Sequence, residues 1–317
     1  MNKMDFFKNP KNKLIMKNGF IVKDSMIVEE CTEGSEKKYF IMVDDEKYLM
    51  KDSSYNQKRK QKSLAPYCEY VGSHFVRFCG IDCQETFLGT FNEKPVVICK
   101  NIFKGSIFRP FKELHQSSAG TDLSDKEYTY EDVLYVLQQK KNLRGSKLDN
   151  VLHEFWKRFL LDAILGNRDR HEGNWGFIKK NGETALAPVF DNGSSLLPDV
   201  DLTKSDYKDF CKERVYRIPV SQFKMWKPGI TDRAMRTNFW EMIRDFSTEN
   251  FQKELEWAKT IDIKNGIKNS IVDVPETYAN WFSKIMYLRF NCLILMRDYD
   301  EVWEEVKHIS SVPLEVD

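Results

Sequence analysis

Residues 166–174 read GNRDRHEGN, and residues 190–193 read FDNG. In the first stretch Asp169 and Asn174 are five positions apart, and Asp191 lies in the second. Transfer of a phosphoryl group requires a carboxylate that accepts a proton and oxygen ligands that hold a divalent cation. We therefore interpret Asp169 as a candidate general base, and Asn174 and Asp191 as candidate Mg²⁺ ligands.

An apolar stripe at helical spacing precedes this loop. Its members are Val151, Leu152, Phe155, Trp156, Phe159, Leu160 and Ile164. Gly166 follows at the position where a helix ends in a left-handed residue, for which glycine is preferred. The polar loop is therefore predicted to begin where a buried helix ends.

A hairpin is predicted between the two stretches. Apolar runs at residues 175–178 and 185–190 flank Asn181-Gly182, and Asn-Gly between two such runs is the strongest short-range hairpin signal. Asn174 precedes the first run and Asp191 ends the second, so the hairpin would bring both to its open end. Paired strands lie roughly 5 Å apart, which is close enough for the two side chains to share one Mg²⁺.

Plainer interpretations exist for parts of this pattern. An Asp and an Asn five residues apart are common in loops, where both side chains satisfy backbone groups of turns. The combination of helix end, loop, hairpin and terminal Asp-x-Gly is what favours a catalytic site. His171 is expected chiefly to fix the loop by packing or hydrogen bonding, with direct proton transfer as the alternative.

A second set of candidates lies upstream. Strand-like runs at residues 38–43 and 47–51 flank an acidic turn, and Lys51 ends the second run. Apolar residues from Leu64 recur at helical intervals until Gly80, which places Glu69 on a helix. An ion pair between Lys51 and Glu69 would direct the ammonium toward nucleotide phosphates. An exposed lysine and a solvated glutamate are the ordinary alternative.

Two further segments are candidates for contact with a nucleotide. The turn at residues 30–37 could offer backbone amides to phosphates, although Gly34 is its only glycine. Strands are predicted at residues 86–91 and 95–99, and the chain then continues through Lys100 and Ile102. Backbone groups of these two residues could contact the adenine edge, and an ordinary connecting loop is an equal interpretation.

Lys51, Glu69, the Asn-x-Asp-x-His-x-x-Asn loop at residues 167–174 and Ala-Pro-Val-Phe-Asp at residues 187–191 together resemble the HipA-like serine/threonine kinases. The resemblance covers most of the chain and is specific at the loop. It implies an α+β, bilobal protein-kinase-like fold. A small β-rich N-lobe would comprise residues 1–103, and a larger, mostly helical C-lobe would comprise residues 104–317.

The resemblance also implies an activity. ATP with Mg²⁺ would be the cofactors, the partner would be a protein substrate with a Ser or Thr acceptor, and autophosphorylation would be a side activity. Asp169, Asn174 and Asp191 would have the roles given above, and Lys51 would contact phosphates. Gly34 and Ser35 fall where the family has its phosphate loop, which makes Ser35 a candidate autophosphorylation position.

Two other classes of protein remain alternatives. Arg168 and Arg170 flank Asp169, a feature that also resembles the loop of phosphoinositide kinases. The short chain and the mixed charges of residues 196–217 disfavour a lipid substrate. A silent nucleotide-binding interaction protein is the other alternative, which the presence of all three candidate oxygen-bearing residues disfavours.

Composition limits the possible partners and compartment. The 317 residues are 41% hydrophobic, enough for a sizeable core, and the formal net charge of +1 gives no overall attraction to nucleic acid. Seven scattered cysteines indicate buried thiols, and the start of the sequence lacks an apolar signal region. No stretch approaches the roughly 20 apolar residues of a membrane span. We expect a cytoplasmic protein as synthesised, without membrane insertion. Translocation into host cells as an effector is an expectation from the family likeness alone, and nothing indicates the oligomeric state.

Overall fold

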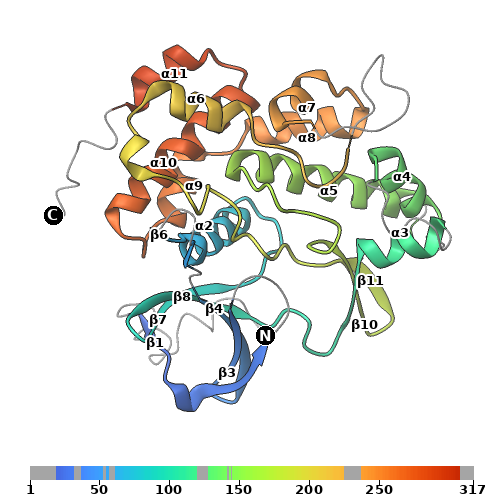
Figure 1. Cartoon of the computed structure of the whole chain (residues 1–317). Coiled ribbons are helices and arrows are strands. Elements are labelled where there is room, and N and C mark those ends of the chain that lie inside the picture. The colour runs from blue at the N-terminus through green and yellow to red at the C-terminus, as the bar shows by residue number, and fades with distance from the viewer. Residues whose placement is uncertain are drawn as a thin grey trace.

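A curled β-sheet and a larger group of helices form the two parts of this chain (Figure 1). The structure is a computed structural model, and it describes residues 19–31, 37–52, 55–56, 61–119, 128–140, 143, 145–224 and 237–307. The predicted phosphate-loop residues Gly34 and Ser35 lie outside the described residues.

The sheet has six strands in the spatial order β1-β7-β8-β4-β3-β2. Its members are β1 (Phe20–Ile21), β2 (Ile27–Cys31), β3 (Lys38–Val43), β4 (Glu46–Asp52), β7 (Thr86–Phe91) and β8 (Lys94–Lys100). Neighbouring strands are antiparallel, except that β1 runs parallel to β7. Two-residue turns with positive φ at residues 44–45 and 92–93 connect β3 to β4 and β7 to β8, as the twist of a hairpin favours. The predicted strands of this region are therefore confirmed.

The two faces of this sheet have different partners. Met50 and Ile98 lie on one face, in a small core of their own. Val97 and Cys99 belong to the main core on the other face, because successive side chains of a strand alternate. By the same alternation Lys51 lies on that second face. Helix α2 (Ala65–Phe78) packs on it through contacts with β7 and β8, so Lys51 is directed toward this helix.

Helices dominate the remainder of the chain. They are α3 (Phe111–Ala119), α4 (Tyr130–Gln138), α5 (Ser146–Leu165), α6 (Lys208–Tyr216), α7 (Phe239–Asp245), α8 (Glu249–Lys259), α9 (Ile263–Ser270), α10 (Glu276–Arg289) and α11 (Tyr299–Val306). Short 3₁₀ turns lie at Asp24–Met26 and Leu202–Lys204, and a π-helical turn lies at Phe290–Ile294. Within the described ranges, no helix has both the length and the apolar composition that crossing a bilayer requires.

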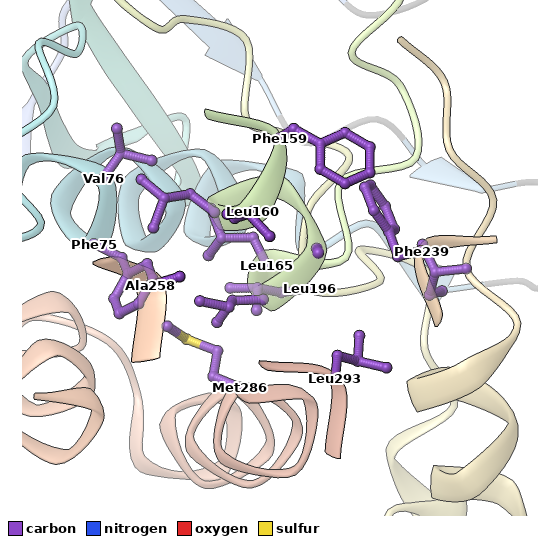
Figure 2. Close-up of a cluster of buried hydrophobic side chains, with 14 of the residues drawn as sticks. Phe75, Val76, Phe159, Leu160, Leu165, Leu196, Phe239, Ala258, Met286 and Leu293 are labelled. Atoms are coloured by element: carbon purple, nitrogen blue, oxygen red, sulfur yellow. The ribbon is translucent and has the colours of Figure 1, made fainter. Parts of the chain in front are cut away.

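Apolar side chains from distant segments meet around α5 (Figure 2). Phe75 comes from α2, Leu160 and Leu165 come from α5, and Met286 comes from α10. Leu196, from the segment after Asp191, enters the same cluster. Because α2 also covers the sheet, burial of apolar surface in this cluster joins the sheet to the helical part.

A three-stranded sheet carries the predicted hairpin. Its strands are β9 (Ile107–Pro110), β10 (Gly176–Lys180) and β11 (Glu183–Leu186), in the order β11-β10-β9. Asn181 and Gly182 both have positive φ, at 52° and 85°, as a tight hairpin turn requires. A two-stranded ribbon also pairs β5 (Tyr55–Asn56) with β6 (Gln61–Lys62).

The second hairpin strand is shorter than predicted. It ends at Leu186, and Asp191 is therefore not at the end of the β11 ladder. Pro188 has no N–H to donate, and the chain leaves the hairpin there. Val189 instead pairs with the segment after α2: its N–H donates to Asp82 O at 2.8 Å, and its carbonyl accepts from Gln84 N at 2.8 Å.

Two long stretches that the sequence predicts as helical are interrupted. Phe246 is extended between α7 and α8, and its ring packs 4.9 Å from that of Trp156. Met296 has a φ of 54° between the π-helical turn and α11. Asp298 then begins α11 by accepting hydrogen bonds from the N–H groups of Asp300 and Glu301. Side-chain packing and capping thus end helices that periodicity alone would continue.

The architecture confirms the predicted α+β fold with two parts of different composition. The small part is β-rich, and the large part is mostly helical. The division near Phe103 stays a prediction. Strand β8 ends at Lys100 and the next strand, β9, pairs with β10, so the chain passes from one sheet to the other in that region.

Gly166, which ends α5, provides a test of this arrangement. Its φ is 62°, and a Cβ atom there would lie 2.2 Å from Nη1 of Arg289. Arg289 Nη1 donates to Leu165 O at 2.8 Å, so it cannot withdraw without losing this bond. We expect Gly166→Ala to lower the free energy of unfolding by about 3 kcal/mol, from left-handed strain plus the clash.

Gly80→Ala is the matched control for chemical denaturation. Gly80 follows α2 with a φ of 80°, and a Cβ atom there would meet nothing within 4 Å. Only backbone strain of about 1 to 2 kcal/mol is expected there. Equal losses in the two variants would show that Arg289 does not constrain Gly166.

Candidate active site

Lys51 lies between two carboxylates. Its Nζ is 2.6 Å from Oε2 of Glu69 on α2 and 2.7 Å from Oδ1 of Asp191. Its side chain is 7% exposed. Burial disfavours the charged ammonium, but Glu69 and Asp191 outweigh burial and raise the pKa of Lys51 well above its ordinary value. The predicted ion pair between Lys51 and Glu69 is therefore present, and Asp191 joins it.

One face of α2 holds the segment that contains Asp191. Oε1 of Glu69 accepts the backbone N–H of Asn192 at 2.8 Å, and Oγ of Ser73 accepts from Nδ2 of Asn192 at 3.0 Å. Glu69 and Ser73 share a helix face because they are four residues apart. Gly72 lies between them, and a Cβ there would be 2.9 Å from Cβ of Asn192. The missing side chain of Gly72 therefore allows this close approach.

Asp191 has an unusual backbone and an ionised side chain. Its φ is 59°, in the left-handed region that few non-glycine residues adopt. Burial of Asp191 favours the neutral acid, but Lys51 outweighs burial and lowers the pKa of Asp191 to about 2. The side chain of Asp191 remains one-third exposed, at 33%. Asp191 is thus charged near neutral pH and accessible to a cation.

A buried arginine, Arg170, anchors the loop at residues 166–174 to the residues around it. Arg170 donates from Nε and Nη2 to the two carboxylate oxygens of Asp162 on α5, both at 3.1 Å. It also donates to the carbonyl of Phe190 and to Oδ1 of Asn192, the two neighbours of Asp191. Burial lowers and Asp162 raises the pKa of Arg170, and the net shift is upward. Arg170 therefore ties the Asp169 loop to the Asp191 segment.

Asp162 accepts further hydrogen bonds in addition to those of Arg170. Nδ2 of Asn167 donates to its Oδ1 at 3.2 Å, and Nε2 of Gln222 donates to its Oδ2 at 2.8 Å. Oδ1 of Asn167 in turn accepts the N–H of Asp169 at 3.0 Å. The buried side chains of Asn167 and Arg170, one before and one after Asp169 in the sequence, thus set the position of Asp169.

Asp169 itself is exposed, and its Oδ2 lies 3.4 Å from Oγ of Ser194. Nδ2 of Asn174 donates to the carbonyl of Asp169 at 2.8 Å, and Oδ1 of Asn174 has no hydrogen-bond partner within the described part of the chain, so it is the candidate ligand atom. Nδ1 of His171 accepts the N–H of Gly173 at 3.1 Å, in line with the loop-fixing role predicted for it. The structure thus joins Asp169, His171 and Asn174 in one turn.

The donors of this site fit Mg²⁺. Mg²⁺ takes oxygen ligands and is usually bound through one or two carboxylates plus substrate phosphates. Asp191 supplies an ionised carboxylate and Asn174 an amide oxygen. Among the described residues, no three His, Cys, Asp or Glu side chains gather in a way that could hold a metal ion.

Lys100, the last residue of β8, is a predicted adenine contact whose backbone groups already have hydrogen-bond partners. Lys100 donates its N–H to Glu85 O at 2.9 Å, and its carbonyl accepts from Nε2 of Gln84 at 2.8 Å. Backbone groups of Ile102, by contrast, have no hydrogen-bond partner among the described residues. Of the two predicted adenine contacts, Ile102 is therefore the more available.

Three half-exposed aromatic rings meet next to Ile102 and Asp191. The rings of Phe103 and Phe108 stack with centroids 4.6 Å apart, and the ring of Phe190 lies edge-on to both at 5.6 and 5.5 Å. Core aromatics are usually fully buried, whereas these rings keep part of their surface open. They can therefore offer a flat apolar surface to a planar ligand.

Several of these residues escape prediction from the sequence alone. Asn192, Ser73 and Gly72 meet only through tertiary contacts, although a glycine inside a helical pattern is a signal of close packing. Arg170 is visible as a flanking charge, but its burial against Asp162 has no local signal. The aromatic cluster combines a connecting loop, an edge strand and the residue before Asp191.

Comparison with known proteins assigns this chain to a family. Residues 26–249 match the family described as HipA-like C-terminal domain. The chain belongs to the HipA-like C-terminal domain family. It is 31% identical over 226 residues to the serine/threonine-protein kinase CtkA of Helicobacter pylori, a match that covers 68% of this chain and 66% of that kinase. The matched region is thus slightly less than two thirds of the relative's length.

The fold agrees with this assignment. The crystal structure of the Helicobacter pylori proinflammatory kinase CtkA superposes with a TM-score of 0.74 at 24% sequence identity. The superposition covers 90% of this chain and 99% of that structure. At this identity the similarity establishes the fold, and the kinase-like arrangement of the two parts is shared.

The ion pair at Lys51 predicts a measurable titration. Lys51→Met removes the cation that most lowers the pKa of Asp191 and leaves its burial in place. We expect the pKa of Asp191 to rise from about 2, as followed by carbon NMR of the carboxylates. Lys47→Met, at an exposed pair with Glu29, is the control. A pKa of Asp191 that stays near 2 in Lys51→Met would contradict the described pairing.

The pair between Arg170 and Asp162 predicts a stability effect. Asp162→Asn keeps the side-chain shape but leaves the buried guanidinium without its carboxylate. Removal of one partner of a buried pair typically costs about 3 to 5 kcal/mol of unfolding free energy, and we expect a loss of this size in urea denaturation. Asp245→Asn, in an exposed pair with Arg244, should change stability little. A similar small change in Asp162→Asn would show that the buried pair is dispensable.

Proposed function

We propose that this chain is an ATP- and Mg²⁺-dependent protein kinase that phosphorylates Ser or Thr hydroxyls. The observation that supports it most is the buried Lys51, bound to both Glu69 and Asp191, with the Asp169 loop tied to the same segment through Arg170. In this proposal Lys51 is the phosphate-binding cation, Asp191 is a metal ligand and Asp169 is the base. The name of the Helicobacter pylori relative supports a Ser/Thr acceptor.

The residues of the chain divide the work of phosphoryl transfer. The acceptor oxygen forms a bond to the γ-phosphorus, the bond from that phosphorus to the β–γ bridging oxygen breaks, and the acceptor proton passes to Asp169. Lys51 has three N–H donors, two of which face Glu69 and Asp191, so one is left for a phosphate oxygen. Bound Mg²⁺, held by Asn174 and Asp191, would neutralise phosphate charge.

Nucleotide specificity is assigned to the segment after β8. Ile102 would exchange backbone hydrogen bonds with the adenine edge, and the rings of Phe103, Phe108 and Phe190 would contact its plane. Lys100 would contact the adenine only if its backbone groups shared their present hydrogen bonds with the nucleotide. The phosphate-loop role of Gly34 and Ser35, and autophosphorylation at Ser35, belong to the proposal on the family likeness. Translocation into a host cell rests on the same likeness.

Replacement of the candidate base tests the proposal. Asp169→Asn should lower the rate of transfer about 10²- to 10⁴-fold and leave ATP binding close to normal, because only proton acceptance is removed. Asp191→Ala should abolish transfer and weaken Mg²⁺-dependent nucleotide binding. Transfer from labelled ATP and calorimetric titration of nucleotide measure the two effects. Asp149→Asn, at an exposed position of α5, is the control. Near-normal transfer by Asp169→Asn would refute the role of Asp169.

The same assay separates the alternative functions. A protein acceptor, the chain itself and phosphoinositide vesicles are offered side by side. Label on protein supports the proposal, and label on lipid alone would indicate a lipid kinase. Nucleotide binding without transfer to any acceptor would indicate a silent binding protein.

A further inference from the structure

An open groove lies next to the Asp169 loop. It has a volume of about 570 Å³ and is lined by Arg168, by residues of 197–204 and by residues of α6 and its C-terminal end. This volume falls in the range of about 300 to 1,000 Å³ that is usual for ligand sites. Arg168 directly precedes Asp169, and Ser194, three residues before the groove residue Leu197, contacts Asp169. The groove therefore begins where the candidate base faces solvent.

The floor of the groove is apolar and rigidly built. Leu197 and Val200 are buried, and Leu196 and Leu197 have consecutive positive φ values of 56° and 62°. Leu196 is fixed on both sides, since its N–H donates to Leu165 O at 2.8 Å and its carbonyl accepts from Nε1 of Trp281 at 3.0 Å. Strained backbone persists only where the surroundings determine it, and it is concentrated at functional sites.

The rim of the groove has more cationic than anionic groups. Arg168, Lys204, Arg214 and Arg217 face Asp199, Asp201 and Glu213. Glu213 is shared by Arg214 at 3.2 Å and Arg217 at 3.1 Å. Asp201 accepts the hydroxyl of Thr203 at 2.6 Å and pairs with Lys204 at 3.5 Å, and the side chain of Lys204 is still 52% exposed. The side chain of Arg217 is 77% exposed, and Arg168 approaches Asp199 only to 3.8 Å. Arg217 and Arg168 therefore still have N–H groups that can bind a carboxylate.

We propose that this groove binds the acceptor polypeptide and selects segments with Asp or Glu near the phosphorylated residue. The carboxylates of such a segment would pair with Arg217 and Lys204, and an apolar side chain would cover Leu197 and Val200. Arg168 would hold the chain where the acceptor hydroxyl reaches Asp169. This inference rests on the proposed kinase function and names the acceptor class of the same site.

Charge reversal on the rim tests the selection of acidic segments. A Ser/Thr peptide set that differs only in Glu, Gln or Lys at flanking positions is phosphorylated by the wild type and by Arg217→Glu and Lys204→Glu. The wild type should prefer Glu peptides, and each reversal should shift the Glu-to-Lys ratio of kcat/KM toward Lys about tenfold. KM for ATP and nucleotide binding should not change, because both residues lie outside the nucleotide site.

Controls separate this inference from the proposed function. Arg244→Glu reverses an exposed, ion-paired arginine on α7 and should leave the peptide preference unchanged. A Glu-rich peptide with Ala in place of Ser/Thr should bind the wild type, by fluorescence anisotropy, about tenfold tighter than Arg217→Glu. Peptide transfer without a charge preference, or a preference that Arg217→Glu does not shift, would overturn the groove assignment alone. Absence of transfer to any protein or peptide would overturn both proposals.

Discussion

The buried carboxylate of Glu69 is the contact on which the candidate site depends. It accepts from Lys51 of the sheet through one oxygen and from the N–H of Asn192 through the other. An ionised group can be buried only where its charge and its lone pairs are satisfied. Glu69 therefore joins the sheet, α2 and the Asp191 segment to one another. The same arrangement that satisfies Glu69 also directs Lys51 and Asp191 toward a common ligand.

Arg170 has the corresponding role in the helical part. Its guanidinium is planar, with donors at fixed angles, so it can bind the Asp162 carboxylate in two-point fashion and still reach Phe190 and Asn192. Asn192 is thus held by α2 from one side and by Arg170 from the other. Asp191, between Phe190 and Asn192, keeps its left-handed φ because both neighbours are fixed. Strain at the candidate metal ligand is thus maintained by the contacts of its neighbours together with its own ion pair with Lys51.

Local signals were sufficient for much of this site. The helix end at Gly166, the turn at Asn181-Gly182 and the strand that ends near Lys51 depend on neighbouring residues, and the sequence predicts each of them correctly. The sequence predicts the path of residues 187–190 wrongly, because Pro188 ends the ladder and the alternative partner at residues 82–84 is distant in sequence. The contacts of Asn192 and Arg170 could not be predicted for the same reason. A buried polar contact between distant segments has no period or spacing that a single sequence reveals.

Helix α2 also restricts how the two parts can move. Oη of Tyr70 donates to Asp273 Oδ2 at 2.8 Å, and Gly266 of α9 allows Phe75 to approach so closely that a Cβ there would lie 2.8 Å from its ring. Burial and the Asp273 contact raise the pKa of Tyr70, so the phenol remains a donor at physiological pH. Helix α2 is therefore anchored to the helical part as well as to the sheet. A motion that separated the sheet from the helices would have to break the pair between Lys51 and Glu69, or pull α9 away with α2. Both changes expose buried polar or apolar groups, so the candidate site is held in its assembled form by the fold itself.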